Sequence, residues 1–149
     1  MSIALRRSIL VSVVIFAITL FASSSAVARD SAVRQSITDA MNTSTAKSYT
    51  GVQFFFGDQS HPEVKQHKGN FTSKKTTNAF GKSDQESCQW AFLSAIKSLH
   101  QRALSEGANA VINIQSITTG ESVSDQAEFV CRAGNVVSKV YLKGDVVVL

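Results

Sequence analysis

The sequence predicts an α+β fold, with one central amphipathic helix packed on a small mixed or antiparallel sheet and a short helix at the N-terminus. The first observation is a helical face, because apolar side chains recur between residues 87 and 106 at Phe92, Ile96, Leu99 and Ala103. The second is Gly107, which ends this helix because glycine adopts the left-handed C-cap conformation without steric cost. The third is the order of the remaining apolar segments, which predicts helix, strand, helix and then three strands.

Strands are expected both before and after the central helix in the chain. Residues 52–56 contain three consecutive phenylalanines, which favours an inner strand buried on both faces; the alternative is an aromatic binding surface. After the helix, apolar and β-branched residues predict three strands, over residues 108–117, 127–133 and 136–142. Gly144-Asp145 is expected to interrupt the last of these before residues 146–149. We expect the three strands to form an antiparallel meander.

The first 28 residues resemble a secretory signal peptide. Arg6 and Arg7 precede an apolar run without charges, and Ala26-Val27-Ala28 fits a signal-peptidase site. Cleavage after Ala28 would release residues 29–149 into the periplasm or the medium. The alternative is an uncleaved anchor, since the charge-free run approaches the roughly 20 apolar residues that span a bilayer. Membrane attachment is expected only through such a retained leader.

The chain is therefore expected to have three parts: a signal peptide at 1–28, an N-terminal helix and polar linker at 29–50, and an α+β domain at 51–149. The helix is predicted over residues 29–42, where apolar residues recur at helical spacing.

Residues 58–84 are predicted to form a long polar loop, with a short strand at most at residues 69–72. Long loops in small domains usually carry function. We therefore expect this segment to face a partner, with surface candidates at Lys74, Lys75 and Lys82.

Charge excludes one class of partner. The formal net charge is +4, but two of these charges lie in the predicted leader, and no block of five or more like charges occurs. A nucleic-acid partner is therefore not expected.

Two cysteines follow the leader, Cys88 and Cys131. An even number of cysteines in an exported chain favours one disulfide. The alternatives are two reduced buried thiols or a pair of metal ligands.

No motif for catalysis is complete. Phe80-Gly81-Lys82-Ser83 resembles the end of a phosphate-binding loop, but Thr76 stands where that loop needs its first glycine. The chain also lacks G-x-S-x-G and an evident carboxylate pair. We therefore predict neither an enzyme nor a cofactor. A hydrolase whose site is assembled only by the fold remains one alternative.

A second alternative is a metal-binding or metal-stress protein. His61, Glu63 and His67 lie within one short segment and carry imidazole and carboxylate ligands, although their spacing fits no strong metal signature.

Three motifs resemble a known family: Glu86-Ser87-Cys88-Gln89, Ala108-Asn109-Ala110-Val111, and the strand that holds Cys131. They are similar to the periplasmic domain of the outer-membrane lipoprotein sensor of the Rcs envelope-stress phosphorelay, and more loosely to the small YbjQ-like domains. The chain also resembles small exported proteobacterial proteins that are often labelled "excinuclease ATPase subunit". The similarity covers residues 87–148.

This resemblance implies a helix–sheet disulfide between Cys88 and Cys131, and binding to partner proteins rather than catalysis. The Rcs sensor is lipidated and has a second disulfide, whereas this chain has no lipobox and no further cysteine pair. Its residues give no support to the excinuclease label. The sequence thus predicts an exported, non-catalytic periplasmic domain that binds an envelope or secreted protein.

Overall fold

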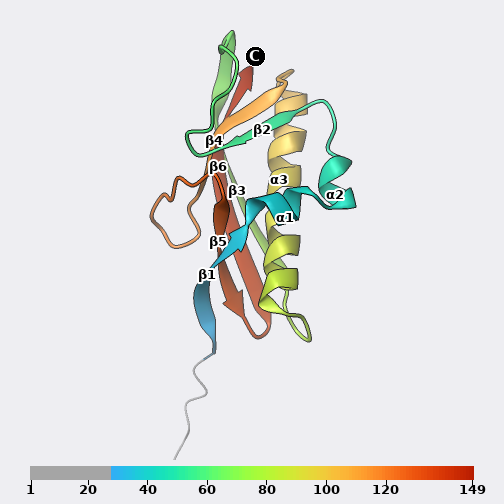
Figure 1. The fold of residues 1–149 in the computed structure, drawn as a ribbon, viewed down its shortest axis with the longest axis vertical. Helices are drawn as coiled ribbons and strands as arrows, with labels where there is room; N and C mark the ends of the chain where they lie inside the picture. The colour runs from blue at the N-terminus through green and yellow to red at the C-terminus, as the bar shows by residue number, and fades with distance from the viewer. Residues whose placement is uncertain (1–27) are drawn as a thin grey trace, which may run out of the picture.

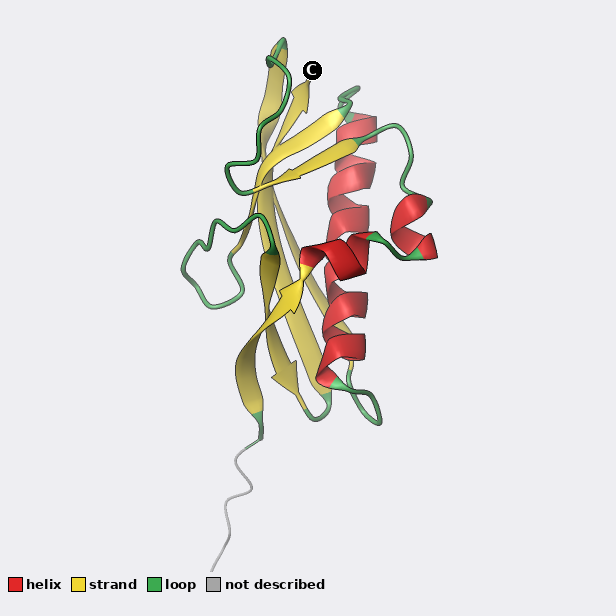
Figure 2. Ribbon diagram, in the orientation of Figure 1, coloured by secondary structure: helices red, strands yellow, loops and turns green. Residues whose placement is uncertain are grey.

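A long helix lies along one face of a curled, mixed, six-stranded sheet (Figure 1, Figure 2). The computed structural model describes residues 28–149, so the predicted leader falls outside the described residues, apart from Ala28. The elements in chain order are β1 (Asp30–Ser36), α1 (Ile37–Met41), α2 (Ser44–Lys47), β2 (Gln53–Phe56), β3 (Gln66–Asn78), α3 (Asp84–Ser105), β4 (Ala110–Ser116), β5 (Glu128–Gly134) and β6 (Val137–Val148). None of the helices in residues 28–149 has both the length and the apolar character needed to cross a membrane.

Strand β6 is the centre of the sheet. One of its edges pairs with β3 along its whole length, and the other edge is shared between β5 and β4. Strand β1 then pairs with β5, and β2 pairs with β4, which gives the order β1-β5-β6-β4-β2. All pairs are antiparallel except β2 with β4. The predicted meander is therefore wrong, because β6 lies between β4 and β5.

Helix α3 forms as the sequence predicts. The hydroxyl of Ser83 caps its first turn by accepting a hydrogen bond from the Glu86 N–H at 3.1 Å. Gly107 follows the last turn with a φ of 66°, in the left-handed region where other residues would be strained. The predicted apolar face is confirmed, since each of its four residues is at most 1% exposed: Phe92, Ile96, Leu99 and Ala103.

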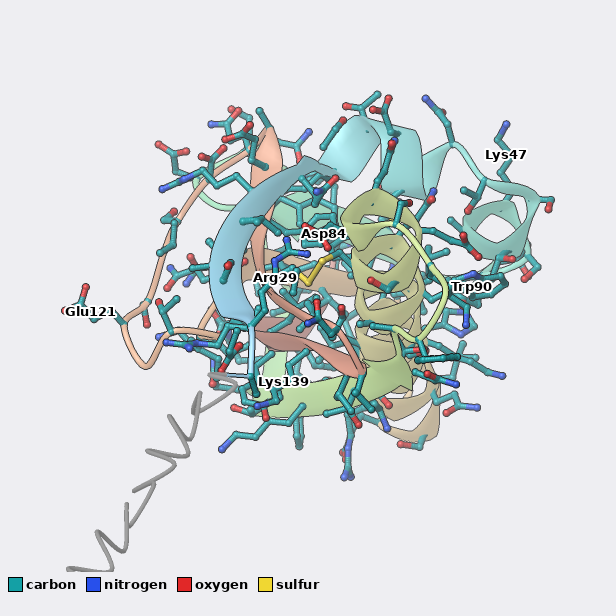
Figure 3. The ribbon with its side chains drawn as sticks, turned by 90° about the horizontal axis from the view of Figure 1, so that it is seen from below. Arg29, Lys47, Asp84, Trp90, Glu121 and Lys139 are labelled. Carbon is teal, nitrogen blue, oxygen red and sulfur yellow. A yellow bond between two sulfur atoms is a disulfide. The ribbon has the colours of Figure 1, made fainter. Side chains whose placement is uncertain are left out.

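The core is packed between α3 and the concave face of the sheet. Phe92 of α3 stacks on Phe129 of β5, with ring centroids 4.1 Å apart, and on Phe56 of β2, at 6.0 Å. One turn before Phe92, Cys88 forms a disulfide with Cys131 of β5, with an S–S distance of 2.07 Å (Figure 3). The favoured disulfide is thereby present, and the described residues contain no free cysteine.

The predicted N-terminal helix over residues 29–42 is wrong in its first half. Residues Asp30–Ser36 form strand β1, and only Ile37–Met41 form the helix α1. Pairing with β5 decides the outcome, because it places Val33 opposite Cys131 and supplies the backbone with a complete ladder. A local helical pattern of five or six residues cannot compete with such pairing, since short isolated helices are marginal.

Strand β2 is an edge strand and not the inner strand that was expected. Its phenylalanines still pack on both faces. Phe54 and Phe56 contact the core under α3, whereas Phe55 joins a second apolar cluster on the other face with Ile112 and Val147. The three consecutive phenylalanines are therefore explained by apolar packing on both faces of the sheet at this corner.

Strand β6 runs without interruption through Gly144, contrary to the expected break. A Cβ atom at Gly144 would lie 2.7 Å from the side chain of Val111 in the neighbouring strand β4. The glycine thus permits close packing inside the strand and does not end it.

The predicted loop over residues 58–84 is also wrong, because Gln66–Asn78 form strand β3. Only Ser73 is buried in this strand, so it lacks the alternation of apolar and polar residues that signals a strand. Two loop segments remain, residues 57–65 before β3 and residues 79–83 after it.

Candidate functional site

The outer edge of β3 is the longest free strand edge in residues 28–149, because β6 is the only described strand that pairs with this 13-residue strand. The register identifies which backbone groups are free. Ala79 N donates to Val136 O at 2.8 Å, so Ala79 and Val136 are a hydrogen-bonded pair that continues the ladder. In an antiparallel ladder such pairs alternate, which turns Ser73, Lys75 and Thr77 toward β6. The N–H and C=O groups of the residues between them point away from β6, at Thr72, Lys74 and Thr76.

This edge is strongly basic. From residue 64 to residue 83 the chain contains no aspartate or glutamate. The same segment contains the lysines Lys65, Lys68, Lys74, Lys75 and Lys82. None of these lysines lies within 4.0 Å of a described carboxylate oxygen, whereas Lys139 does, beside Asp30. The segment therefore carries positive charge that the described part of the chain does not neutralise by contact.

The structure separates the three predicted surface lysines. Lys74 lies on the face of the sheet opposite α3, with its amine 5.7 Å from the ring centroid of Tyr141. Lys75 is half-buried on the side facing α3, because successive side chains of a strand alternate between faces. Lys82 is exposed in the turn that leads into α3. The three lysines thus flank β3 and do not form one compact cluster.

A cleft of about 270 Å³ lies between β3 and α3, beside the free edge. Its walls are formed by β3 from Phe71 to Lys75 and by three residues of α3, Ser98, Leu99 and Arg102. The Arg102 guanidinium lies over the ring of Phe71, 4.7 Å from its centroid. No sequence pattern signals this cleft, because residues of a predicted loop and of a helix come together there only through the pairing of β3 with β6.

The weak metal candidates are all exposed. His61 and Glu63 lie in the loop before β3, and His67 lies at the start of β3. His61 Nδ1 is 2.7 Å from the backbone oxygen of Pro62, and its ring packs edge-on against Phe55. Within residues 28–149, no three histidine, cysteine or acidic side chains are grouped in a way that could hold a metal ion.

The histidines with hydrogen bonds bind backbone carbonyls. His61 contacts Pro62 O, and His100 Nε2 lies 2.7 Å from Thr50 O while its ring stacks on Tyr49. Burial raises the pKa of the Tyr49 phenol, whose hydroxyl donates to Leu93 O. In the described residues neither of these histidines is hydrogen-bonded to a serine, so this geometry gives no support to the hydrolase alternative.

One electrostatic anchor of the fold lies away from β3, at Asp125. Backbone N–H groups of Ala127 and Glu128 donate to Asp125, and Arg34 of β1 adds an ion pair at 3.1 Å. These donors, the backbone groups first, lower the pKa of the Asp125 carboxyl. The carboxylate thus closes the turn before β5.

Comparison of the chain with other proteins adds no identity. No protein-family model, no curated protein and no solved structure matches it. The likeness to the Rcs sensor and to the YbjQ-like domains therefore stays a prediction from the residues, and the functional argument depends on the geometry of β3 and α3.

Proposed function

We propose that this chain is an exported, non-catalytic periplasmic domain that binds an extended segment of another envelope or secreted protein along the free edge of β3. The observation that carries the proposal is the row of outward backbone groups at Thr72, Lys74 and Thr76. Unpaired N–H and C=O groups on a strand edge are a template for one more strand. Strand β3 lies within residues 58–84, the segment that the sequence predicts to face a partner.

The charge of the edge favours a particular partner. Natural edge strands are often protected by lysine, because two basic edges repel one another. The same lysines attract an acidic segment and raise its association rate. A second copy of this chain would present the same lysine-rich edge, so we propose an acidic, extended segment of a different protein.

Export is the second part of the proposal. It is supported by the leader-like sequence of residues 1–28 and by the Cys88–Cys131 disulfide, since disulfides persist in oxidising compartments. Fractionation of cells that produce the chain from Met1, followed by N-terminal sequencing, tests it. We expect periplasmic or secreted protein beginning at Arg29. Cytosolic protein with an intact N-terminus would contradict the proposal.

Site-specific photo-crosslinking tests the binding edge. A benzophenone amino acid is placed at Thr72 on β3, or at Glu121 in the β4–β5 loop, which projects away from α3 on the other side of the sheet (Figure 3). We expect crosslinks to another envelope protein from position 72 and none from position 121. Equal crosslinking from both positions would refute the proposal.

A proline variant makes this test specific for backbone pairing. Thr76→Pro removes an outward N–H without removing a hydrogen bond to β6, and proline is tolerated at such edge positions. Thr76→Ala is the matched control that keeps the N–H. We expect the crosslink from position 72 to be lost with proline and retained with alanine. A crosslink that survives the proline would show that the partner does not pair with this edge.

A further inference from the structure

The cleft between β3 and α3 contains a buried hydroxyl without a partner. Ser73 is 4% exposed, and its Oγ is the one buried side-chain N or O atom in the described residues that forms no hydrogen bond. Leaving such a group unpaired costs about 1–3 kcal/mol, so folded proteins retain few of them. Ser73 belongs to the wall of the cleft, where an acceptor from outside the fold would satisfy its hydroxyl.

The other buried hydroxyls are all satisfied within the fold. Ser87 Oγ and Ser138 Oγ lie 2.8 Å apart, one donating to the other, between α3 and β6. Ser116 Oγ accepts from a backbone N–H of β5 at 3.0 Å, and Thr118 Oγ1 donates to a backbone carbonyl at 2.7 Å. The unpaired hydroxyl of Ser73 is therefore an exception in an otherwise well-paired interior, and it occurs beside a cleft.

Two cations adjoin this hydroxyl. Lys75 follows two residues later on the same side of β3, and Arg102 closes the cleft from α3. The opposing carboxylate is Glu106, whose Oε1 lies 3.4 Å from Arg102 Nη1. Arg102 is exposed and Glu106 is partly exposed, so the pair contributes little energy, and it leaves further N–H donors of Arg102 free. Lys74 also belongs to the lining, so three cations stand against the one carboxylate of Glu106, which suits an anionic group.

The cleft also has the right position for a docked strand. An added strand would lie roughly 4.8 Å from β3, and alternate side chains would point to the face that carries α3. Those side chains would stand beside Ser73 and Lys75, at the mouth of the cleft. A volume of about 270 Å³ leaves room for a carboxylate side chain and several waters, since a water takes up about 30 Å³.

We propose that this cleft binds the carboxylate of a glutamate or aspartate side chain carried by the segment that pairs with β3. The proposal rests on the proposed function and names the feature by which the partner is recognised. Arg102 and Lys75 attract the carboxylate, and the Ser73 hydroxyl donates to one of its oxygens. Phe71 and Leu99 also line the cleft, and hydrogen bonds between charged groups of this kind are stronger than neutral ones.

A single-residue probe tests the cleft without the partner. The full chain, produced from Met1 with ¹⁵N label and purified after export, is titrated with N-acetyl-glutamate N-methylamide at pH 7. The glutamine analogue is the control, because it has the same shape and no charge. We expect saturable amide shifts around Ser73, Lys75 and Arg102 with glutamate only. No saturable shift, or equal shifts with glutamine, would overturn the proposal.

Variants assign the interaction to the cleft. Arg102→Gln should weaken glutamate binding roughly tenfold, because one charge-assisted hydrogen bond and one charge are lost. Lys97→Gln removes a cation of α3 that does not line the cleft and should leave the affinity unchanged. Ser73→Ala should keep the fold and weaken binding. Equal losses in the Arg102 and Lys97 variants, or tighter binding of inorganic phosphate than of the glutamate probe, would overturn the assignment.

The edge and the cleft can fail separately. Thr76→Pro leaves the walls of the cleft in place, so the probe should bind this variant as it binds the parent chain. If Thr76→Pro abolishes the position-72 crosslink but the parent chain does not bind the glutamate probe, the docking edge is retained and the carboxylate cleft is overturned. If the glutamate probe binds but the position-72 crosslink persists in Thr76→Pro, the cleft is retained as a carboxylate site and the docking of a strand is overturned.

Discussion

Strands β3 and β6 are paired along their whole length and yet are opposite in character. Strand β6 buries residues on the face toward α3, among them Val140 and Leu142, at 0% and 1% exposure. Strand β3 buries Ser73 alone and exposes most of its length. One strand has neighbours at both edges, whereas the other has a neighbour at one edge and solvent at the other.

This difference teaches that two strands of one ladder can be held by different forces. Strand β6 is fixed by burial of apolar side chains under α3, which is the dominant favourable term in folding. Strand β3 is fixed by its backbone bonds to β6 and by the few side chains that reach α3. Substitutions should therefore act through packing in β6 and through the backbone in β3.

The largest effect on the free energy of unfolding is expected from removing the disulfide that joins α3 to β5. The Cys88–Cys131 bond spans 43 residues, and a loop of that length should stabilise the fold by about 4 kcal/mol in the chain-entropy model. Replacing both cysteines by alanine should lower the free energy of unfolding by roughly 2–5 kcal/mol, measured by urea denaturation. An unchanged midpoint would mean that packing alone fixes α3 on β5.

The next effect compares two residues that face each other across the ladder. Ser73 and Leu142 are register partners, and both lie on the side of α3. Leu142→Ala should lower the free energy of unfolding by roughly 2–5 kcal/mol, because it opens a cavity in the core. Ser73→Ala should leave stability unchanged or raise it slightly, since the unpaired hydroxyl is removed. Similar losses in both variants would show that β3 is packed as tightly as β6.

The same contrast explains how far the sequence could predict the fold. Helix α3 was predictable because burial of one face produces a periodic pattern of apolar residues, and β4 and β5 because they are runs of apolar and β-branched residues. The disulfide was predictable because two cysteines follow the leader-like segment. Strand β3 was not predictable, because its polar residues are held by a partner strand that lies about 60 to 80 residues later in the chain. The candidate edge and cleft were missed for this reason, although the lysines without neighbouring acids in residues 64–83 were visible.

Strand β1 was misread for a related reason. Its helical spacing of apolar residues is real, but the pairing partner β5 lies about a hundred residues away in the chain. Propensity is a weak prior that long-range pairing overrides. By contrast, the uninterrupted course of β6 depends on packing, because Gly144 is needed where Val111 approaches.

A smaller effect should separate the two edges of β3 itself. Thr77→Pro removes a backbone donor turned toward β6, whereas Thr76→Pro removes a donor turned outward. We expect the first to lower the free energy of unfolding by about 1–3 kcal/mol more than the second. Hydrogen exchange of the parent chain provides an independent check. The amides of Thr72, Lys74 and Thr76 should exchange faster than those of Ser73, Lys75 and Thr77, and uniform protection would contradict the register argument.

The smallest effect concerns acid, and it again distinguishes the two regions. Asp125 holds the turn before β5, and its pKa is lowered by the backbone N–H groups of Ala127 and Glu128 and by Arg34. A carboxyl with a lowered folded pKa stabilises the fold above its unfolded pKa of about 3.9, and this stabilisation is lost as the pH falls through the folded pKa. Strand β3 contains no carboxylate, so it has no counterpart to this loss.

Asp125→Ala should therefore be less stable than the parent chain at pH 6, and the difference should shrink as the pH falls below about 4. Glu121→Ala, in the same β4–β5 connection, is the matched control, because no described ion pair involves that residue. Urea denaturation at several pH values measures the difference, and NMR titration of the carboxyl carbon gives its pKa directly. A difference that stays constant down to pH 2 would mean that Asp125 stabilises the β1–β5 corner by the packing of its side chain and not by its charge.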